Sequence, residues 1–476
     1  FMLLLLLLPL MVLIYRRQNN RRLPPGPPRL PIIGNILQFG RNPHRSLADL
    51  AEKYGPLMHL KLGFVDMIVL SSPETAKQVI HGQDHLVSYR PQLAFGRAHD
   101  HNEKSVVWIN DVARRTPLKK LCKEHLFSLQ KLDESECLRR EKIEDLRDYL
   151  HECSDSGTVV NVADAAFTTS LNMISSSFFS TDFATFDSEK SQEVKEIVHM
   201  IMKLLGSPNL ADYFPFLKPF DPRGIQRKAE VCFGKLFDVF NRFIDERMRS
   251  GTRKNDLLQA LLDVGNMEGS NFTRDDILHV LLDLFVAGTD TTSATVEWAM
   301  TELLRNPSKM TIVKNELKDV VGDKTQVEES DTLKLPYLEA VIKETFRLHP
   351  VAPLMVPRTT SADVEIDGYV VPKDAHILVN IWAVGRSARV WESPESFIPE
   401  RFLNSKIDLK GQNFELIPFG SGRRRCLGVP LVLRVVPLVV ASMIHDIDWE
   451  LENGTPPEKM DMNDEFKLSL QKLIPL

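Results

Sequence analysis

The sequence predicts a mainly α-helical fold with small β-sheets. Apolar residues recur at helical spacing through most of the chain, whereas segments with strand-like alternation are few and short. One predicted helix is far longer than the others and runs from about Arg274 to Arg305. At about 1.5 Å per residue it would be roughly 48 Å long, which is enough to cross a whole domain.

The composition is that of an ordinary globular protein. Of the 476 residues, 43% are hydrophobic and 26% are charged, which is sufficient for a large core. A net charge of −5 does not suggest the basic face that nucleic-acid binding needs, so we expect no nucleic-acid partner. The five cysteines are sparse and form no C-x-x-C pair, which argues against a disulfide framework or a structural zinc site.

The amino-terminal residues predict a membrane anchor and a hinge. Residues 2–15 are almost wholly apolar, and four arginines follow between positions 16 and 22. A spanning helix needs roughly 20 residues, so we expect residues 1–15 to be a truncated anchor, with the positive charges keeping the body in the cytosol. A buried amino-terminal helix is the alternative. The basic and proline-rich residues 16–34 are expected to form a stiff hinge before a single domain, residues 35–476.

The shorter elements follow from the same periodicities. Helical spacing of apolar residues marks 47–54, 73–81, 139–151 and 194–205. Strand-like segments are a hairpin over 57–70 and further strands within 364–371 and 377–381.

The long helix combines clear ends with an unusual middle. Thr273 is a suitable N-cap with Asp276 three residues on, and Asn306-Pro307 ends the helix. The apolar middle, 281–287, leads into the sequence AGTDTT at 287–292. Buried hydroxyls and a buried Asp need partners, and the Thr291 hydroxyl can bond the Ala287 carbonyl, which bends a helix and makes room for water. A satisfied structural polar patch explains the motif about equally well.

A glycine-rich loop presents one cysteine before an apolar helix, about Val429–His445. The positive helix end and Arg423, Arg424 and Arg425 are expected to lower the pKa of the Cys426 thiol. Such a thiolate can ligate a metal or act as a nucleophile, but no base lies nearby in the sequence. A buried structural cysteine fits poorly beside three arginines.

Together these motifs resemble the cytochrome P-450 family. Its cysteine-loop pattern, F-x-x-G-x-R-x-C-x-G, is matched by Phe419, Gly422, Arg424, Cys426 and Gly428. Its central-helix, E-x-x-R and P-E-R-F patterns are matched by 287–292, by Glu344 and Arg347, and by 399–402, in the family's order. The resemblance implies the cytochrome P-450 fold, with haem b between the long central helix and the cysteine loop, and makes 35–476 one haem-thiolate catalytic domain.

The resemblance also implies a role for individual residues. Cys426 would be the axial ligand of the haem iron. Asp290 and Thr291 would hold water and relay protons to dioxygen. The remaining cofactor residues would be Phe419, Gly422, Arg424, Gly428, Arg358 and Lys119, with Arg424 and Arg358 on the haem propionates. Glu344, Arg347 and Arg401 would form a buried ion network. The substrate would lie beside Val286, Ala287, Val351 and Leu354.

The chain looks most similar to plant microsomal members that hydroxylate terpenols and diterpenes, on segments 282–292, 296–300 and 211–215. This implies a monooxygenase that inserts one oxygen atom from O2 into a small apolar plant metabolite, a terpenoid. Electrons would come from NADPH through NADPH–cytochrome reductase at the cytosolic face of the endoplasmic reticulum membrane. An alkaloid or phenolic oxidase is the alternative. A haem-thiolate isomerase or dehydratase is a second, against which Asp290 and Thr291 argue.

One stretch departs from the family's pattern. Where the family has W-R-x-x-R, this chain has Arg115-Thr116-Pro117-Leu118-Lys119. Thr116-Pro117 is typical of a helix start, so we expect this helix to begin a turn late. Lys119 can meet a propionate only as a point charge, so haem affinity is expected to suffer, and a catalytically impaired relic is a further alternative. Arg114, Arg115, Lys119, Lys120 and Lys123 would form a basic dock for the reductase.

Overall fold

The computed structural model describes residues 22–186, 189–269 and 271–476. The predicted anchor, 1–15, and the first part of the predicted hinge, 16–21, lie outside the described residues. Within the described ranges, no helix has both the length and the apolar character needed to cross a bilayer. The chain divides into two compact units, one formed by residues through 91 with 354–384, the other by 92–353 with 385–476. The single catalytic domain stays a prediction.

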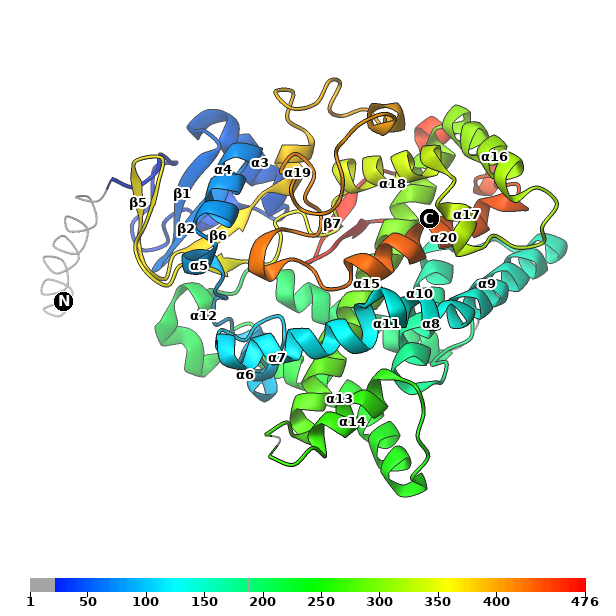
Figure 1. Ribbon diagram of the computed structural model, residues 1–476. Helices are drawn as coiled ribbons and strands as arrows, with labels where there is room; N and C mark the ends of the chain where they lie inside the picture. Colours follow the sequence, from blue (N-terminus) through cyan, green and yellow to red (C-terminus); the bar gives the residue numbers. More distant parts are fainter. Residues whose placement is uncertain (1–21, 187–188, 270) are drawn as a thin grey trace, which may run out of the picture. The chain divides into compact units, whose positions relative to one another are not determined.

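The smaller unit contains most of the β-structure (Figure 1). Its main sheet has the order β1 (Leu57–Leu62), β2 (Val65–Leu70), β6 (His376–Val379), β3 (Arg358–Thr359). The predicted hairpin over 57–70 is confirmed, since β1 and β2 pair antiparallel with Leu57 opposite Leu70. β2 and β6 pair in parallel. The predicted strand over 377–381 ends early, because α19 (Ile381–Gly385) begins there.

A second hairpin in this unit joins β4 (Val364–Ile366) to β5 (Tyr369–Val371). Asp367 and Gly368 form its turn with φ of 48° and 75°, the left-handed backbone that an Asp-Gly turn favours. The remaining elements of the unit are α2 (Ile36–Phe39), α3 (Pro43–Tyr54), α4 (Pro73–Lys77), the π-turn η1 (Gln78–Gly82) and α5 (Asp84–Val87). They confirm the helices predicted over 47–54 and 73–81.

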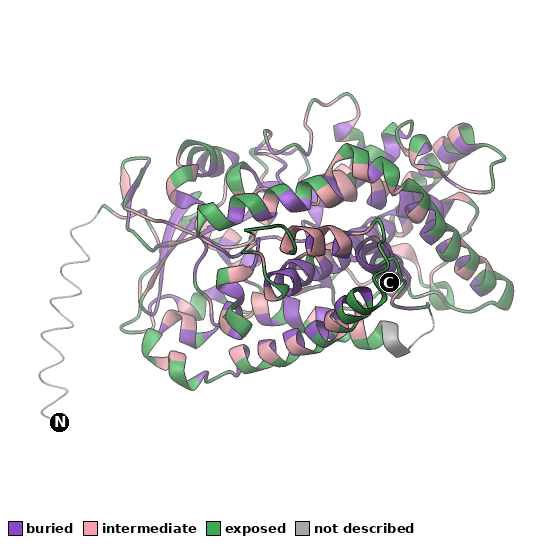
Figure 2. Ribbon diagram, turned by 60° about the horizontal axis from the view of Figure 1, so that its bottom comes forward, coloured by how far each residue is buried: buried purple, intermediate pink, exposed green. Residues whose placement is uncertain are grey.

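The larger unit is mostly helical, and its outer helices have one exposed and one buried face (Figure 2). In chain order its elements are η2 (Phe95–Asp100), α6 (His101–Lys104), α7 (Val112–Cys122), η3 (Lys123–Phe127), α8 (Leu129–Glu134), α9 (Glu136–Ser156), α10 (Val162–Phe179), α11 (Glu189–Gly206), α12 (Leu210–Tyr213), η4 (Pro215–Phe220), α13 (Ile225–Ser250), α14 (Leu257–Gly265), α15 (Arg274–Arg305), α16 (Pro307–Val321), α17 (Glu329–Thr332), α18 (Pro336–Leu348), η5 (Pro399–Phe402), η6 (Gly422–Arg424), α20 (Val429–His445), η7 (Glu452–Gly454), η8 (Pro457–Lys459), β7 (Asp464–Phe466) and β8 (Leu470–Lys472).

The long central helix α15 has the predicted bounds, and α10, α13, α14, α18 and α20 pack around it (Figure 1). Its start is fixed by a reciprocal capping box. The Thr273 hydroxyl accepts from Asp276 N at 3.2 Å, and Asp276 Oδ2 accepts from Thr273 N at 2.8 Å. The mainly helical fold with small sheets is therefore confirmed.

Helix α7 begins earlier than predicted. It starts at Val112, because the Asp111 carboxylate accepts from Ala113 N at 2.8 Å and caps the first turn. Pro117 lies inside the helix, where it removes one backbone hydrogen bond without ending the helix. The late start predicted at Thr116-Pro117 is thus wrong, because the Asp111 cap lies six residues before Pro117 and starts the helix there.

Candidate functional site

The middle of α15 presents one accessible stripe on an otherwise buried helix. Between Asp276 and Leu303, every residue is buried except Leu284, Ala287, Gly288 and Thr291. Their spacing of three, one and three places them on one face. A side chain at position 288 would meet the Ile174 methyl of α10 at 2.9 Å, so this glycine allows α10 to pack closely. Three of its four residues are small, so the middle of the stripe leaves room for a flat group against the helix.

The cysteine loop leads into α20, which has the predicted bounds and packs on α15. Cys426 is exposed, and its N–H donates to the Phe419 carbonyl at 3.0 Å. Gly422 has φ of 71°, a backbone conformation that residues other than glycine rarely adopt. A Cβ at Gly428 would lie 3.8 Å from the Cys426 sulfur, so the backbone there runs directly behind the thiol.

The pKa of Cys426 differs from the expectation. Although water can reach Cys426, the surrounding protein desolvates its thiol and raises its pKa, and the backbone N–H of Gly428, the Arg425 guanidinium and the backbone N–H of Val429 oppose this. The predicted net lowering is wrong, because lost solvation outweighs the helix end and the arginine. A thiolate here therefore needs a bound cation, which a haem iron would provide.

The structure brings Glu344, Arg347 and Arg401 together. Arg347 donates to both oxygens of Glu344, at 2.7 and 2.8 Å, and Arg401 Nε donates to Glu344 Oε1 at 3.0 Å. The Glu344 and Arg347 side chains are inaccessible to water. Phe346 of the same helix contacts Phe419 edge to face, with ring centroids 5.0 Å apart. Helix α18, which carries Glu344 and Arg347, therefore contacts the cysteine loop through Phe346.

The basic residues predicted to bind the haem contact protein groups in each unit. Arg424 donates to the carbonyls of Val107 and Ile109 at 2.9 and 2.7 Å, and Lys119 Nζ donates to the Arg423 carbonyl at 2.8 Å. In the smaller unit, Arg358 Nη1 donates to Asp84 at 3.0 Å. Their pairing with propionates stays a prediction.

Asp290 and Thr291 are neighbours in sequence but face different surroundings. The Thr291 hydroxyl donates to the Ala287 carbonyl at 2.7 Å, as predicted, and lies on the accessible stripe. Asp290 is fully buried and accepts from Gln471 Nε2 of β8 at 2.7 Å. Burial raises the pKa of Asp290 to about 6, although Ser469, Lys467 and Gln471 oppose this. The acid thus points at the carboxyl-terminal hairpin.

The residues predicted to line a substrate pocket are not gathered on the stripe. Ala287 lies on it, but Val286 belongs to the hydrophobic core. Val351 is buried, and its carbonyl accepts from Leu470 N at 2.7 Å. Leu354 belongs to the smaller unit and is buried there. Their contact with a substrate stays a prediction.

Two buried histidines and a buried acid were not predicted. His101 and His279 share a hydrogen bond of 2.7 Å between their Nδ1 atoms, and His101 Nε2 lies 3.1 Å from Asp283. The partners are too far apart in the sequence for a local pattern to connect them. The available signal was an ionisable pair, His279 and Asp283, at a spacing of four on a helix predicted to be buried.

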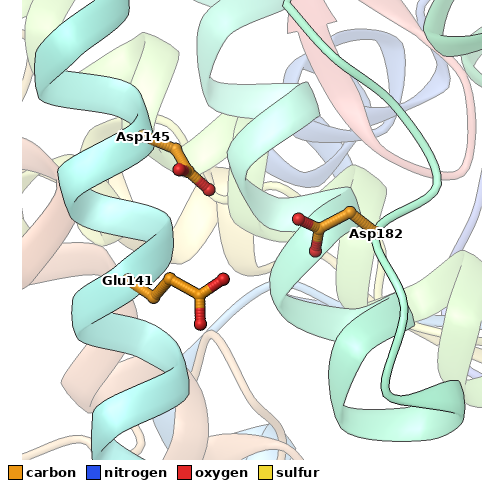
Figure 3. Close-up of side chains that lie close together, drawn as sticks. All are labelled: Glu141, Asp145 and Asp182. Carbon is orange, nitrogen blue, oxygen red and sulfur yellow. The ribbon is translucent and has the colours of Figure 1, made fainter.

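A group of carboxylates elsewhere has the geometry of a metal site. Glu141, Asp145 and Asp182 point toward one another (Figure 3). Lys142 Nζ contacts all three, at 2.8, 3.1 and 2.5 Å. The ammonium therefore provides the positive charge, and its pKa is raised because the hydrogen bonds it donates to Asp182, Glu141 and Asp145 outweigh the effect of burial.

Comparison with known proteins agrees with the site. The family model Cytochrome P450 matches residues 24–474. Cytochrome P450 76T24 of Catharanthus roseus is 51% identical over 459 residues, which cover 95% of this chain and 92% of the relative. Ferruginol synthase of Isodon rubescens is 45% identical, covering 95% and 93%. Geraniol 8-hydroxylase of Swertia mussotii is 45% identical, covering 95% and 92%.

Proposed function

Because this chain belongs to the cytochrome P450 family of haem-dependent monooxygenases, we propose that it hydroxylates a small terpenoid. One atom of O2 enters a C–H bond and the other leaves as water, which consumes two electrons from NADPH and two protons. The terpenoid substrate is supported by the names of the relatives, which include a geraniol hydroxylase and a ferruginol synthase.

The proposal is carried by two features of the larger unit: an exposed Cys426 just before α20, and an accessible stripe on α15. The helices α15 and α20 pack on each other. The residues fit a haem, because the thiol offers a soft ligand and the small side chains of the stripe leave room for a flat ring. Cys426 would hold the iron, and Arg424 and Lys119 would face the propionates. When bound, the haem supplies the activation of dioxygen.

The residues of α15 would then manage water and protons. The Thr291 hydroxyl donates a hydrogen bond to the Ala287 carbonyl, so its oxygen is left to accept one from a water on the stripe. Asp290 has a pKa of about 6, near neutral pH, which suits a proton store. Since Gln471 binds its carboxylate, delivery requires Asp290 to leave that partner.

The family implies a reductase partner, and we place both proteins at the endoplasmic reticulum membrane with the catalytic body in the cytosol. The apolar residues 1–15 and the arginines after them support an anchor. Arg115 is buried, so it cannot belong to the predicted basic surface for the reductase. Arg114, Lys119, Lys120 and Lys123 are left as the candidate contacts.

The first test is a reduced carbon monoxide difference spectrum of the full chain expressed in microsomes. We expect a thiolate-type Soret band that Cys426→Ser abolishes and that Cys137→Ser, at another exposed cysteine, leaves unchanged. A missing band in the unsubstituted protein would favour the impaired relic.

The second test incubates the protein with reductase, NADPH and a panel of monoterpenols and diterpenes, together with an alkaloid and a phenol. Turnover of the alkaloid or phenol without any terpenoid would overturn the substrate proposal.

A further inference from the structure

A short segment of the larger unit, residues 101–110, connects α15 to the cysteine loop. At its start, the Ser105 hydroxyl lies 2.7 and 2.8 Å from the two oxygens of Asp283 on α15. At its end, the carbonyls of Val107 and Ile109 accept from Arg424, which lies two residues before Cys426. The segment therefore bridges the two elements between which the haem is proposed to lie.

The α15 end of the segment is a buried polar cluster, which we call the latch: His101, Ser105, His279 and Asp283. All four residues are at most 8% exposed. Phe233 packs on the His101 ring at 5.0 Å, and Phe237 packs on the His279 ring at 5.1 Å. A cluster so enclosed loses much free energy if one bond is left unmade.

The hydrogen bonds of the latch can all be directed toward Asp283. If His101 Nε2 donates to Asp283, its Nδ1 is an acceptor, and His279 must donate from Nδ1. A neutral His279 with its proton on Nδ1 meets this need, and burial and His101 lower the pKa of His279 to about 4. The Ser105 hydroxyl donates to Asp283 and accepts from the backbone N–H of Val107 and Trp108, each at 3.1 Å.

The backbone before the latch is strained. His99 and Asp100 have φ of 50° and 57°, a left-handed conformation that L-residues with side chains rarely adopt. Each such residue is less stable in this conformation than in the right-handed one. Two left-handed residues in succession are retained only where nearby contacts stabilise them. His101 follows directly, and its contacts in the latch stabilise this turn.

We propose that the latch is a positioning device for residues 105–110, and that through them Asp283 and Ser105 set the position of Arg424 beside Cys426. Neither residue touches the reacting atoms. Because the segment supplies the acceptors of Arg424, its displacement would move the guanidinium and loosen the haem. This inference rests on the proposed placement of the haem at Cys426.

The test compares two substitutions of the same kind on α15. Asp283→Asn removes the charge at the centre of the latch. Asp275→Asn is the matched control: Asp275 pairs with Lys104 of α6, is 48% exposed, and lies 3.8 Å from His279 Nε2, beyond hydrogen-bond distance. Ser105→Ala removes one hydroxyl, and Ser105→Thr retains it. For each full-chain holoprotein, haem transfer to excess apomyoglobin gives the rate of haem loss, and hydrogen–deuterium exchange reports residues 105–110.

We expect Asp283→Asn and Ser105→Ala to lose haem roughly tenfold faster or more, as expected for a broken hydrogen bond to a buried charge. Amide exchange at 105–110 should rise in both variants, while Ser105→Thr and Asp275→Asn stay near the unsubstituted protein. Equal haem loss in Asp283→Asn and Asp275→Asn would overturn the proposal, and so would an unchanged Ser105→Ala. If Asp283→Asn does not fold, Ser105→Ala decides. If the unsubstituted protein binds no haem, the proposed function fails, and the exchange of Ser105→Ala still tests the latch.

Discussion

Glu344 and Lys142 are each the centre of a cluster of opposite charges, but only the partners of Lys142 are exposed to water. The side chains of Glu344 and Arg347 are inaccessible, and Arg401 is 11% exposed. Lys142 is also buried, yet its partners Glu141, Asp145 and Asp182 are 64%, 47% and 38% exposed. The exposed acids can turn to solvent if their partner is lost, whereas Arg347 cannot.

The difference shows that distance alone does not rank ion pairs. The short contacts around Lys142 are as close as those around Glu344. Removing one partner of a buried pair typically costs about 3–5 kcal/mol, because the other charge is left unsolvated, while exposed pairs contribute about 0–1 kcal/mol.

The largest effect is expected for Glu344→Gln. Arg347 and Arg401 would lose their shared carboxylate, and the free energy of unfolding should fall by about 3 kcal/mol or more. Urea unfolding measures this. Glu339→Gln on the same helix is the control, because Glu339 pairs with Lys343 while 66% exposed. If both variants lost a similar free energy of unfolding, burial would not be what makes the Glu344 pair important.

The next effect is expected for Asp290→Asn, because Asp290 is a buried carboxylate that accepts a hydrogen bond from the neutral amide of Gln471. Its pKa is about 6 in the fold against 3.8 ordinarily. Between these values the folded state binds more protons than the unfolded state, so the free energy of unfolding should fall as pH rises through this window. At about pH 7.5, Asp290→Asn should be more stable than the unsubstituted protein by on the order of 2 kcal/mol, and the gain should vanish near pH 4. A gain independent of pH would show that the charge is not the cause.

Arg401→Lys keeps the charge of the buried cluster but removes the planar fork. Arg401 donates from Nε to Glu344 and from Nη1 to the Glu392 carbonyl at 2.9 Å. One of these bonds should be lost, which lowers the free energy of unfolding by about 1 kcal/mol. Arg401→Ala should cost clearly more. Equal thermal midpoints for the two variants would mean that the retained charge contributes nothing.

The smallest effect is expected for Asp182→Asn. Two carboxylates would still face Lys142, so the free energy of unfolding should change by less than about 1 kcal/mol. The Lys142 ammonium fills the centre, so Ca2+ or Mn2+ should not raise the thermal midpoint of the unsubstituted protein. Stabilisation by either ion that Asp182→Asn removes would identify a metal site instead.

Local rules in the sequence determined much of the fold. The bounds of α15 and α20 were predictable, because Thr273 with Asp276, Asn306-Pro307 and the glycine loop before Val429 fix helix ends through contacts within a few residues. The cysteine loop was recognisable for the same reason, since its turn and its ligand are adjacent. The contact of Thr291 with Ala287 followed from helix geometry alone.

Only the tertiary structure decided how the buried charges are arranged. Whether Asp290 faces Thr291 or Gln471 depends on a hairpin 181 positions away, and the latch joins residues 178 positions apart. The pKa of Cys426 depends on how much solvent the fold removes, which overrides the nearby helix end and arginine. Solvation and long-range hydrogen bonds exist only once distant segments meet, and no local pattern encodes them.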